Sequence, residues 1–310
     1  MKTRVLTALL AFLCAIACSC EKADSISSIN EGRTETTASE KIDNDSGENM
    51  TVTSAPTFTG NYTAEEKLFY RDGKKIYGKL YLPEGSGSFP TVMIAHGFGG
   101  NLTYNEGYAE NFAKNGIAAY IFDFIGGGYG IRSDGSMTEM SVLTEATDMN
   151  TVFDGIAELP EIDKSNMFVM GESQGGFVAS YIAASRPDDV RGLVAVYPAY
   201  VIHDDAWQRT PDPDNIPDRL TVMGMTIGGI YNRDAMSFDI YDMMPDYKRK
   251  VLIIHGTADG IVPISYSERA VETFPSAELV KIDGAGHGFY GNDADHAAEL
   301  ALKFVKHNCF

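Results

Sequence analysis

Ser173 stands in the segment Gly171-Glu172-Ser173-Gln174-Gly175, which fits the pattern G-x-S-x-G. A short apolar run (167–170) precedes the pattern, and a run typical of a buried helix (177–184) follows it. In this context the pattern predicts a nucleophile elbow, a turn so tight that the serine backbone is strained and its hydroxyl is exposed. Its two glycines are expected where a Cβ atom would collide with a neighbouring strand or helix. The alternative is a glycine-rich turn with an incidental serine.

A serine hydroxyl is a weak nucleophile at neutral pH, so it needs a base and a third group that holds the base. Asp259 follows the apolar run 251–256, and His287 follows the run 278–282. All three side chains therefore follow predicted strands, and open α/β sheets place functional groups at the carboxyl ends of their strands. The chain order serine, aspartate, histidine is the order that a sheet with such an elbow requires. We predict that Ser173, Asp259 and His287 form a catalytic triad.

Other ionisable residues compete for these roles. His255 also ends a predicted strand, but it precedes the acid, so we interpret it as a packing and hydrogen-bonding residue. Glu172 is next to the serine but wrongly placed along the turn to hold His287; it either tunes the electric field of the site or is a solvated or hydrogen-bonded side chain. His203 is either a surface residue or a substrate contact.

Acyl transfer also requires donors aimed at the oxygen that becomes negative. One predicted donor is the backbone N–H of Gln174, directly after the nucleophile. The loop His96-Gly97-Phe98-Gly99-Gly100 follows the apolar run 91–95, and its glycines allow backbone amides to turn inward. We predict that the backbone N–H of Phe98 is the second donor of this oxyanion hole.

The elements that position these groups alternate between strand and helix. Residues 67–82 read as a hairpin with a turn at 72–73, and the later runs are continuous apolar strands. Strands are predicted at 91–95, 118–124, 167–170, 192–197, 251–256 and 278–282, and helices near 104–115, 141–159, 177–184, 265–274 and 293–306. This alternation predicts an α/β fold with a doubly wound, mostly parallel sheet.

One connection is too long for this rhythm. About fifty residues separate the strand near Val196 from the strand near Val251, and they are too apolar for a free loop. We predict a small cap inserted at about 200–249 over the carboxyl edge of the sheet. Trp207, Met225 and Tyr231 are its candidate substrate-binding residues, because aromatic and methionine side chains suit a pocket for a flat apolar group. The alternative is that they only attach the cap to the core.

The amino terminus is typical of an export signal. Positive charge at residues 2–4 is followed by an apolar run too short to span a bilayer, and by small residues with Cys18 and Cys20. Residues 1–20 resemble a bacterial lipoprotein signal, in which one of these cysteines is lipidated; an ordinary cleaved signal is the alternative. Residues 21–60 are rich in small and polar types and are predicted to form a disordered tether. We therefore expect an exported protein that is anchored to the outer membrane only through this lipid; a secreted protein is the alternative.

Composition restricts the remaining partners. The 310 residues carry a formal net charge of −18, which argues against binding to nucleic acid or to an anionic membrane surface. Only Cys309 of the four cysteines lies beyond the signal, so an internal disulfide or a cysteine metal site is excluded from the body. No motif implies a metal or an organic cofactor.

From about Lys67 onward the chain resembles the α/β-hydrolases, and within them the bacterial cinnamoyl or feruloyl esterases. The motifs that carry the resemblance are H-G-F-G-G at His96, F-D-F at Phe122, S-D-G with T-E-M-S-V at 133–142, G-E-S-Q-G-G at Gly171, H-G-T-A-D at His255 and G-A-G-H-G-F at Gly284. Relatives often have histidine where this chain has Glu172, and the loop 126–130 departs from their usual version. The resemblance implies a 61–310 hydrolase domain with the same triad and oxyanion amides.

Three functions are compatible with these residues. The first is a serine carboxylesterase that hydrolyses hydroxycinnamate esters on plant cell-wall sugars, with a small-molecule or oligosaccharide ester as substrate. The second is a serine peptidase or a general short-chain esterase or lipase of the same fold. The third is a surface binding protein on an inactive hydrolase scaffold.

Overall fold

The computed structural model describes residues 56–309. The predicted signal segment and most of the predicted tether lie outside these residues. The predicted start of the domain at residue 61 is wrong by a few residues, because the first strand begins at Thr57. Its polar first residues pair with the end of the next strand, Thr57 opposite Ser86, so backbone hydrogen bonding extends the strand where no apolar pattern marks it.

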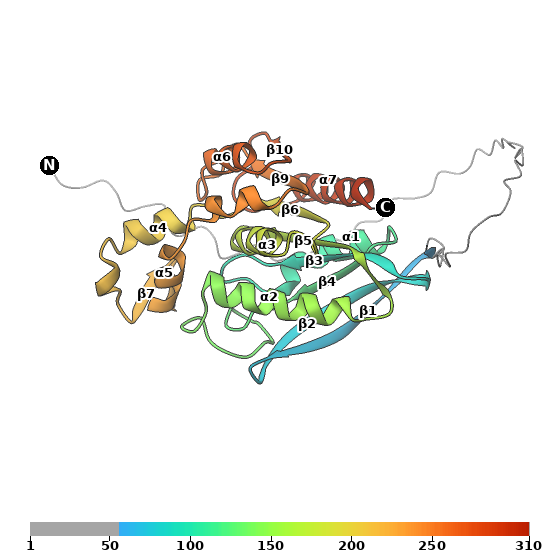
Figure 1. Ribbon diagram of the computed structural model, residues 1–310, viewed down its shortest axis with the longest axis horizontal. Coiled ribbons are helices and arrows are strands. Elements are labelled where there is room, and N and C mark those ends of the chain that lie inside the picture. The colour runs from blue at the N-terminus through green and yellow to red at the C-terminus, as the bar shows by residue number, and fades with distance from the viewer. Residues whose placement is uncertain (1–55, 310) are drawn as a thin grey trace, which may run out of the picture. The chain divides into compact units, whose positions relative to one another are not determined.

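An eight-stranded sheet forms the centre of the fold (Figure 1). Its order is β1-β2-β4-β3-β5-β6-β9-β10; β1 and β2 pair antiparallel, as do β2 and β4, and every other pair is parallel. The strands are β1 (Thr57–Arg71), β2 (Lys74–Ser86), β3 (Phe89–Ala95), β4 (Ala118–Phe122), β5 (Ile162–Glu172), β6 (Gly192–Val196), β9 (Lys250–Gly256) and β10 (Ala277–Ile282). The predicted mostly parallel α/β sheet is confirmed, and the predicted hairpin forms its antiparallel edge.

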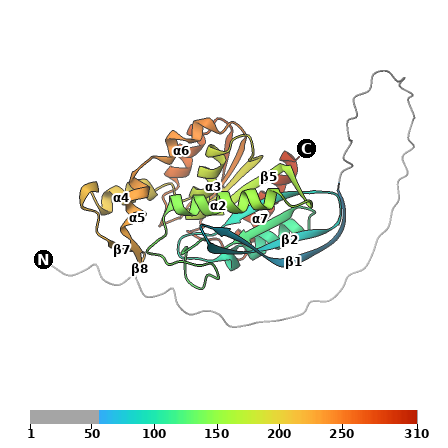
Figure 2. The same ribbon diagram turned by 60° about the horizontal axis from the view of Figure 1, so that its bottom comes forward.

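Helices cover both faces of this sheet (Figures 1 and 2). The helices are α1 (Glu106–Ala113), α2 (Val142–Ala157), α3 (Gln174–Ser185), α6 (Ser265–Thr273) and α7 (Asn292–Asn308), with a short 3-10 helix η1 (Leu102–Asn105). Side chains of α2, α3 and α6 share one buried cluster with the sheet, and side chains of α1 and α7 share the other. No helix within residues 56–309 is long and apolar enough to cross a membrane.

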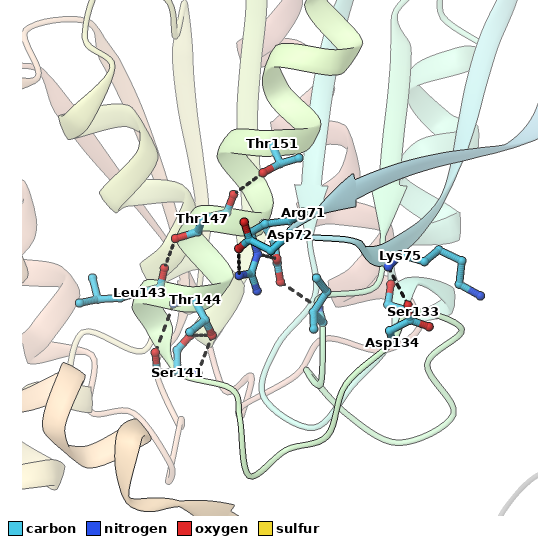
Figure 3. Close-up of polar contacts among 12 residues, drawn as sticks. Arg71, Asp72, Lys75, Ser133, Asp134, Ser141, Leu143, Thr144, Thr147 and Thr151 are labelled. Carbon is cyan, nitrogen blue, oxygen red and sulfur yellow. Dashed lines mark hydrogen bonds and ion pairs between the residues drawn. The ribbon is translucent and has the colours of Figure 1, made fainter.

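The start of α2 shows how local sequence fixes an element. Ser141 is the N-cap, and its Oγ accepts a hydrogen bond from the Thr144 backbone N–H at 3.2 Å. In return, the Thr144 Oγ1 accepts from the Ser141 backbone N–H at 2.8 Å (Figure 3). This capping box satisfies two amides that have no partner inside the helix. It explains why α2 begins at Val142, close to the predicted start.

An ion pair between Arg71 and Asp148 connects the edge hairpin to helix α2, and its acidic partner is buried. The Asp148 side chain is fully buried, and its Oδ1 accepts from the Arg71 Nε at 2.5 Å, while its Oδ2 accepts from the Ile125 backbone N–H at 2.9 Å. Burial raises the pKa of Asp148 to about 6, although Arg71 opposes the shift. The pair therefore joins β1, α2 and the loop after β4.

We expect Arg71→Met to lower the free energy of unfolding by about 3 kcal/mol at pH 8, because it leaves a buried carboxylate without its cation. The loss should shrink at pH 5, where Asp148 is protonated and neutral, so the difference between variant and wild type grows as pH rises through about 6. Urea denaturation at both pH values measures this. Lys114→Met, which removes an exposed ion pair between Lys114 and Glu110 within one helix turn, is the control and should lower the stability much less at either pH. An equal loss at both pH values would contradict this account.

Between β6 and β9 the chain leaves the sheet and forms a small inserted region, at the left of Figures 1 and 2. Strands β7 and β8 pair as a hairpin whose turn residues, Met223 and Gly224, both have positive φ. Helices α4 and α5 flank this hairpin. The elements of the region are α4 (Ile202–Arg209), η2 (Pro213–Asn215), β7 (Arg219–Val222), β8 (Met225–Gly228), α5 (Gly229–Met236), η3 (Ile240–Asp242) and η4 (Met244–Asp246).

Candidate active site

The turn between β5 and α3 has the geometry of a nucleophile elbow. Ser173 has φ 51° and ψ −118°, a backbone conformation that is strained for a residue with a side chain. Its backbone N–H donates to the Val196 carbonyl at 3.0 Å, which holds the turn against β6. A Cβ atom at Gly171 would lie 2.1 Å from the Gly175 carbonyl oxygen, and one at Gly175 would lie 2.3 Å from the Ala95 oxygen. Both glycines are therefore required by the close approach of backbone to backbone.

The structure brings the three residues of the predicted triad together. Asp259 follows β9, and His287 follows β10. The His287 Nε2 lies 2.9 Å from the Ser173 Oγ, and the His287 Nδ1 lies 2.7 Å from the Asp259 Oδ2. Segments 114 and 28 residues apart along the chain thus meet at the carboxyl edge of one sheet.

Four hydrogen bonds hold the Asp259 carboxylate, whose side chain is fully buried. Its Oδ1 accepts from the backbone amides of Ile261 and Val262 at 2.8 and 2.9 Å, and its Oδ2 faces the rings of His287 and His255. Burial by itself would raise the pKa of Asp259, but these donors, His255 first, hold the pKa below its ordinary value. The carboxylate is therefore ionised at neutral pH.

The ionised carboxylate decides the tautomers of both rings, because it can only accept hydrogen bonds. The His287 Nδ1 must carry a proton toward Asp259, so the Nε2 of the neutral ring is free to accept from the Ser173 hydroxyl. The His255 Nε2 faces two acceptors, the Asp259 Oδ2 and the Val262 carbonyl, so it also carries a proton. This agrees with the interpretation of His255 as a packing and hydrogen-bonding residue.

Two backbone amides beside Ser173 have no partner within residues 56–309. They are the N–H groups of Gln174, at the first position of α3, and of Phe98, in the loop after β3. The Phe98 loop lies against the serine, since a Cβ atom at Gly97 would be 3.2 Å from the Ser173 Cβ, and Gly99 has φ 71°. These amides are the predicted oxyanion donors, and both stay available to a ligand.

The glycine-rich loop 126–130 packs against the Phe98 loop and holds its backbone in place. The Gly99 N–H donates to the Gly127 carbonyl at 3.2 Å, and the Tyr129 N–H donates to the Gly99 carbonyl at 3.1 Å. A Cβ atom at Gly128 would lie 2.0 Å from the Gly100 oxygen. The loop thus holds the Phe98 segment by a backbone bridge that needs glycine.

A cavity of about 110 Å³ opens beside Ser173. Apart from Ser173, Gln174 and the pair Asp205 and Arg209, its lining is mostly apolar or aromatic. The other lining residues are Phe98, Ala199, Val201, Ile202, Val222, Met223, Tyr231, Ile261 and Val262. The inserted region and the loop after β9 therefore form its walls.

The three candidate substrate-binding residues differ in position. Tyr231 lines this cavity, and its ring packs on Phe98 with centroids 5.6 Å apart. Trp207 does not line it; the indole lies on α4, is 39% exposed and packs on His203. Met225 is also absent from the lining, because its side chain turns toward Gly99. Neither Trp207 nor Met225 lines this cavity, since residue type alone does not give a side chain's direction. Their part in substrate binding stays a prediction.

Two residues around the site, Glu145 and Tyr197, belong to none of the predicted catalytic groups. Buried Glu145 accepts from the Gln174 Nε2 at 2.8 Å, and the Tyr231 hydroxyl donates to the Gln174 Oε1 at 2.7 Å, so the Gln174 side chain is fixed from two helices. Tyr197 packs on the His287 ring with centroids 4.9 Å apart. Its position directly after β6 was the one signal in the sequence. No group of three or more candidate metal ligands gathers anywhere in the described part of the chain.

Comparisons with known proteins agree with this fold. A family model described as "Serine aminopeptidase, S33" matches residues 88–216, and one described as "TAP-like protein" matches residues 239–306. The solved structure of Est1E from Butyrivibrio proteoclasticus with ferulic acid bound is 28% identical, covers 78% of this chain and 96% of that chain, and has a TM-score of 0.69.

Curated relatives include thioester hydrolases. The mitochondrial palmitoyl-protein thioesterase ABHD10 of Bos taurus is 27% identical over 60% of this chain. The thiohydrolase aneE of Aspergillus aculeatus is 26% identical, also over 60% of this chain. The chain spans 64% and 63% of the lengths of these two proteins, which is less than two thirds. The chain is thus similar to both esterases and thioesterases.

Proposed function

The chain has the α/β-hydrolase fold and resembles the serine esterases of that superfamily, and from this premise we propose that it hydrolyses carboxylic esters through an acyl-enzyme. The observation that carries the proposal is the continuous chain of hydrogen bonds from Asp259 through His287 to Ser173. Two unbonded amides lie beside its end. Such a chain can activate a hydroxyl, and such amides can stabilise a developing oxyanion.

In the proposed reaction the Ser173 Oγ attacks the ester carbonyl carbon while its proton passes to the His287 Nε2. The carbonyl oxygen becomes negative and accepts hydrogen bonds from the backbone amides of Phe98 and Gln174. The imidazolium then gives its proton to the leaving alcohol oxygen as the C–O bond breaks. Water repeats the sequence on the acyl-enzyme, with His287 as base and then as acid, and the acid product leaves.

We propose a hydroxycinnamate as the acyl group. An aromatic, largely apolar cavity beside the nucleophile suits a flat ring. The same cavity contains Asp205 and Arg209, which can bind a phenolic hydroxyl. Burial raises the pKa of Asp205, while Arg209 opposes that shift. The bound ferulic acid in the Est1E structure is a hydroxycinnamate and supports the choice.

This assignment predicts that Asp205→Leu lowers kcat/KM for methyl ferulate by about tenfold, because the phenol loses a charged acceptor. The value for methyl cinnamate, which has no phenolic hydroxyl, should change less than twofold. Asp204→Leu on the same helix is the matched control, since that side chain is exposed and bonds Tyr266 instead. Equal effects of Asp205→Leu on both esters would argue against phenol recognition at this residue.

Thioester hydrolysis is the second candidate, and the curated relatives favour it. The same groups would act, because attack on a thioester carbonyl also produces an oxyanion. Parallel assays on methyl ferulate, p-nitrophenyl acetate, an acyl thioester and an aminoacyl anilide separate esterase, thioesterase and peptidase. Turnover of acetate alone would remove the hydroxycinnamate assignment.

Fluorophosphonate labelling tests whether Ser173 is a reactive nucleophile, on which the whole proposal depends. We expect one covalent adduct per chain, found by mass spectrometry on the peptide that contains Ser173, and none in Ser173→Ala. A chain that is folded but stays unlabelled would be a binding protein on an inactive scaffold, and the proposal would fail.

A further inference from the structure

Glu172, directly before the nucleophile, is enclosed by polar groups from three other segments. The Tyr197 hydroxyl donates to its Oε1. With the Asn105 amide in the orientation that satisfies both of its polar atoms, the Asn105 Nδ2 donates to the Glu172 Oε2 at 3.1 Å and its Oδ1 accepts from the His96 N–H at 3.1 Å. The carboxyl group thus joins the elbow to the start of the Phe98 loop and to the residue after β6.

Tyr197 connects this carboxyl group to the proposed base. It has φ 34°, an uncommon conformation for a residue with a side chain, and its backbone N–H donates to the Ile254 carbonyl at 2.7 Å. Its ring packs on the His287 ring at 4.9 Å and edge-on against Phe289 at 4.7 Å. A movement of the Tyr197 hydroxyl would therefore move the surface on which His287 rests.

Solvent reaches Glu172 at a second cavity, of about 410 Å³, between α1 and α7. Six ionisable side chains face Glu172 or line this cavity. They are Tyr104 of η1, Tyr108 of α1, Tyr197, His287, and the exposed carboxylates Asp295 and Glu299 of α7. Burial raises the pKa of Glu172 to about 7, and the Tyr197 hydrogen bond and the charge of His287 act against that rise. The side chain consequently changes charge within the neutral range.

We infer that Glu172 is a positioning residue for His287: through Tyr197 it orients the ring, and its ionised carboxylate stabilises the imidazolium that forms when Ser173 gives up its proton. This deepens the proposed function and rests on it. Asp259 holds one side of the imidazole, and Glu172 and Tyr197 supply negative charge and packing on another. A negative charge near a developing positive charge in a site of low dielectric favours the transition state over the ground state.

The test is the ratio of kcat between Glu172→Gln and wild type from pH 5.5 to pH 9. Glutamine keeps the size and can still accept from Tyr197, but it carries no charge. We expect Glu172→Gln to lower kcat by about tenfold at pH 8.5, with KM changed less than twofold. The kcat values of the two proteins should converge below pH 6, where wild-type Glu172 is protonated and is therefore as neutral as glutamine. A ratio that is constant across this range would overturn the inference, because a purely structural role has no reason to follow pH.

Tyr197→Phe is the second variant and keeps the ring on His287 while removing the hydroxyl. The hydrogen bond from that hydroxyl lowers the pKa of Glu172. Its loss should therefore move the midpoint of the pH dependence upward by about 0.5 pH units or more. An unchanged midpoint would overturn the inference even if Glu172→Gln does not fold. Glu299→Gln, on the far side of the same cavity, is the control and should match wild type.

The outcomes separate the two proposals. If wild type turns over no ester, or if Ser173→Ala turns over as much as wild type, the proposed function fails. If turnover depends on Ser173 but neither variant changes the pH dependence as described, the assignment of Glu172 alone fails.

Discussion

Ser173→Ala is expected to lower kcat for any ester substrate by about 10⁶-fold, because no other group can form the acyl-enzyme at this position. The hydroxyl removed is the one that lies 2.9 Å from the His287 Nε2. Residual turnover would come from the amides of Phe98 and Gln174 acting on water alone. Steady-state assays with methyl ferulate, at enzyme concentrations high enough to detect slow turnover, give the ratio of kcat between the variant and wild type.

A matched serine on the following helix provides the control. Ser180 is fully buried, and its Oγ donates to the Gly176 carbonyl at 2.7 Å and lies 2.7 Å from the Tyr200 hydroxyl, away from the proposed reaction. Ser180→Ala should keep kcat within twofold while lowering stability. Full activity in Ser173→Ala would remove the mechanism.

Asp259→Asn is expected to lower kcat by about 10⁴-fold with little change in the structure of the loop. An asparagine can place its N–H₂ group toward the His287 Nδ1, which favours the tautomer with the proton on Nε2. That nitrogen could then no longer accept the proton of Ser173. The backbone amides of Ile261 and Val262 can still donate to the remaining carbonyl oxygen, so the turn should persist.

Asp283→Asn is the control for Asp259, since it is an exposed carboxylate that accepts from the Thr257 Oγ1 at 3.1 Å in the same region. It should leave kcat unchanged. A loss of less than tenfold in Asp259→Asn would show that another group holds His287. His255 is the residue to examine then, because its Nε2 lies 3.0 Å from the same carboxylate oxygen.

The fold could be predicted from the sequence because several of its central strands are buried along most or all of their length. Every residue of β4 and β6 is buried, so each strand appears in the sequence as an unbroken apolar run. The start of β1 could not be predicted in the same way. Its residues are mostly exposed and are held by backbone pairing with β2, which leaves no apolar periodicity.

The proximity of Ser173, Asp259 and His287 could be predicted because parallel strands bring their carboxyl ends to one edge. The direction of the cap side chains could not. Trp207 and Met225 have the composition of a pocket, but their contacts depend on how the β7–β8 hairpin and α4 rest on the core. The sequence also leaves the role of Glu172 open between tuning the electric field of the site and simple solvation or hydrogen bonding. Its partners come from three segments that are distant along the chain. The chemical roles of all these residues stay predictions until the variants are assayed.

The inserted region touches the proposed oxyanion donors as well as the cavity. Met225 abuts Gly99, Tyr231 packs on Phe98, and the Tyr231 hydroxyl binds the side chain of Gln174. If the proposed function holds, we therefore expect a substitution that reshapes the hairpin to admit a new acid also to change the turnover rate. Redesign of selectivity would best begin at Ile261 and Val201, which line the same cavity from outside that hairpin.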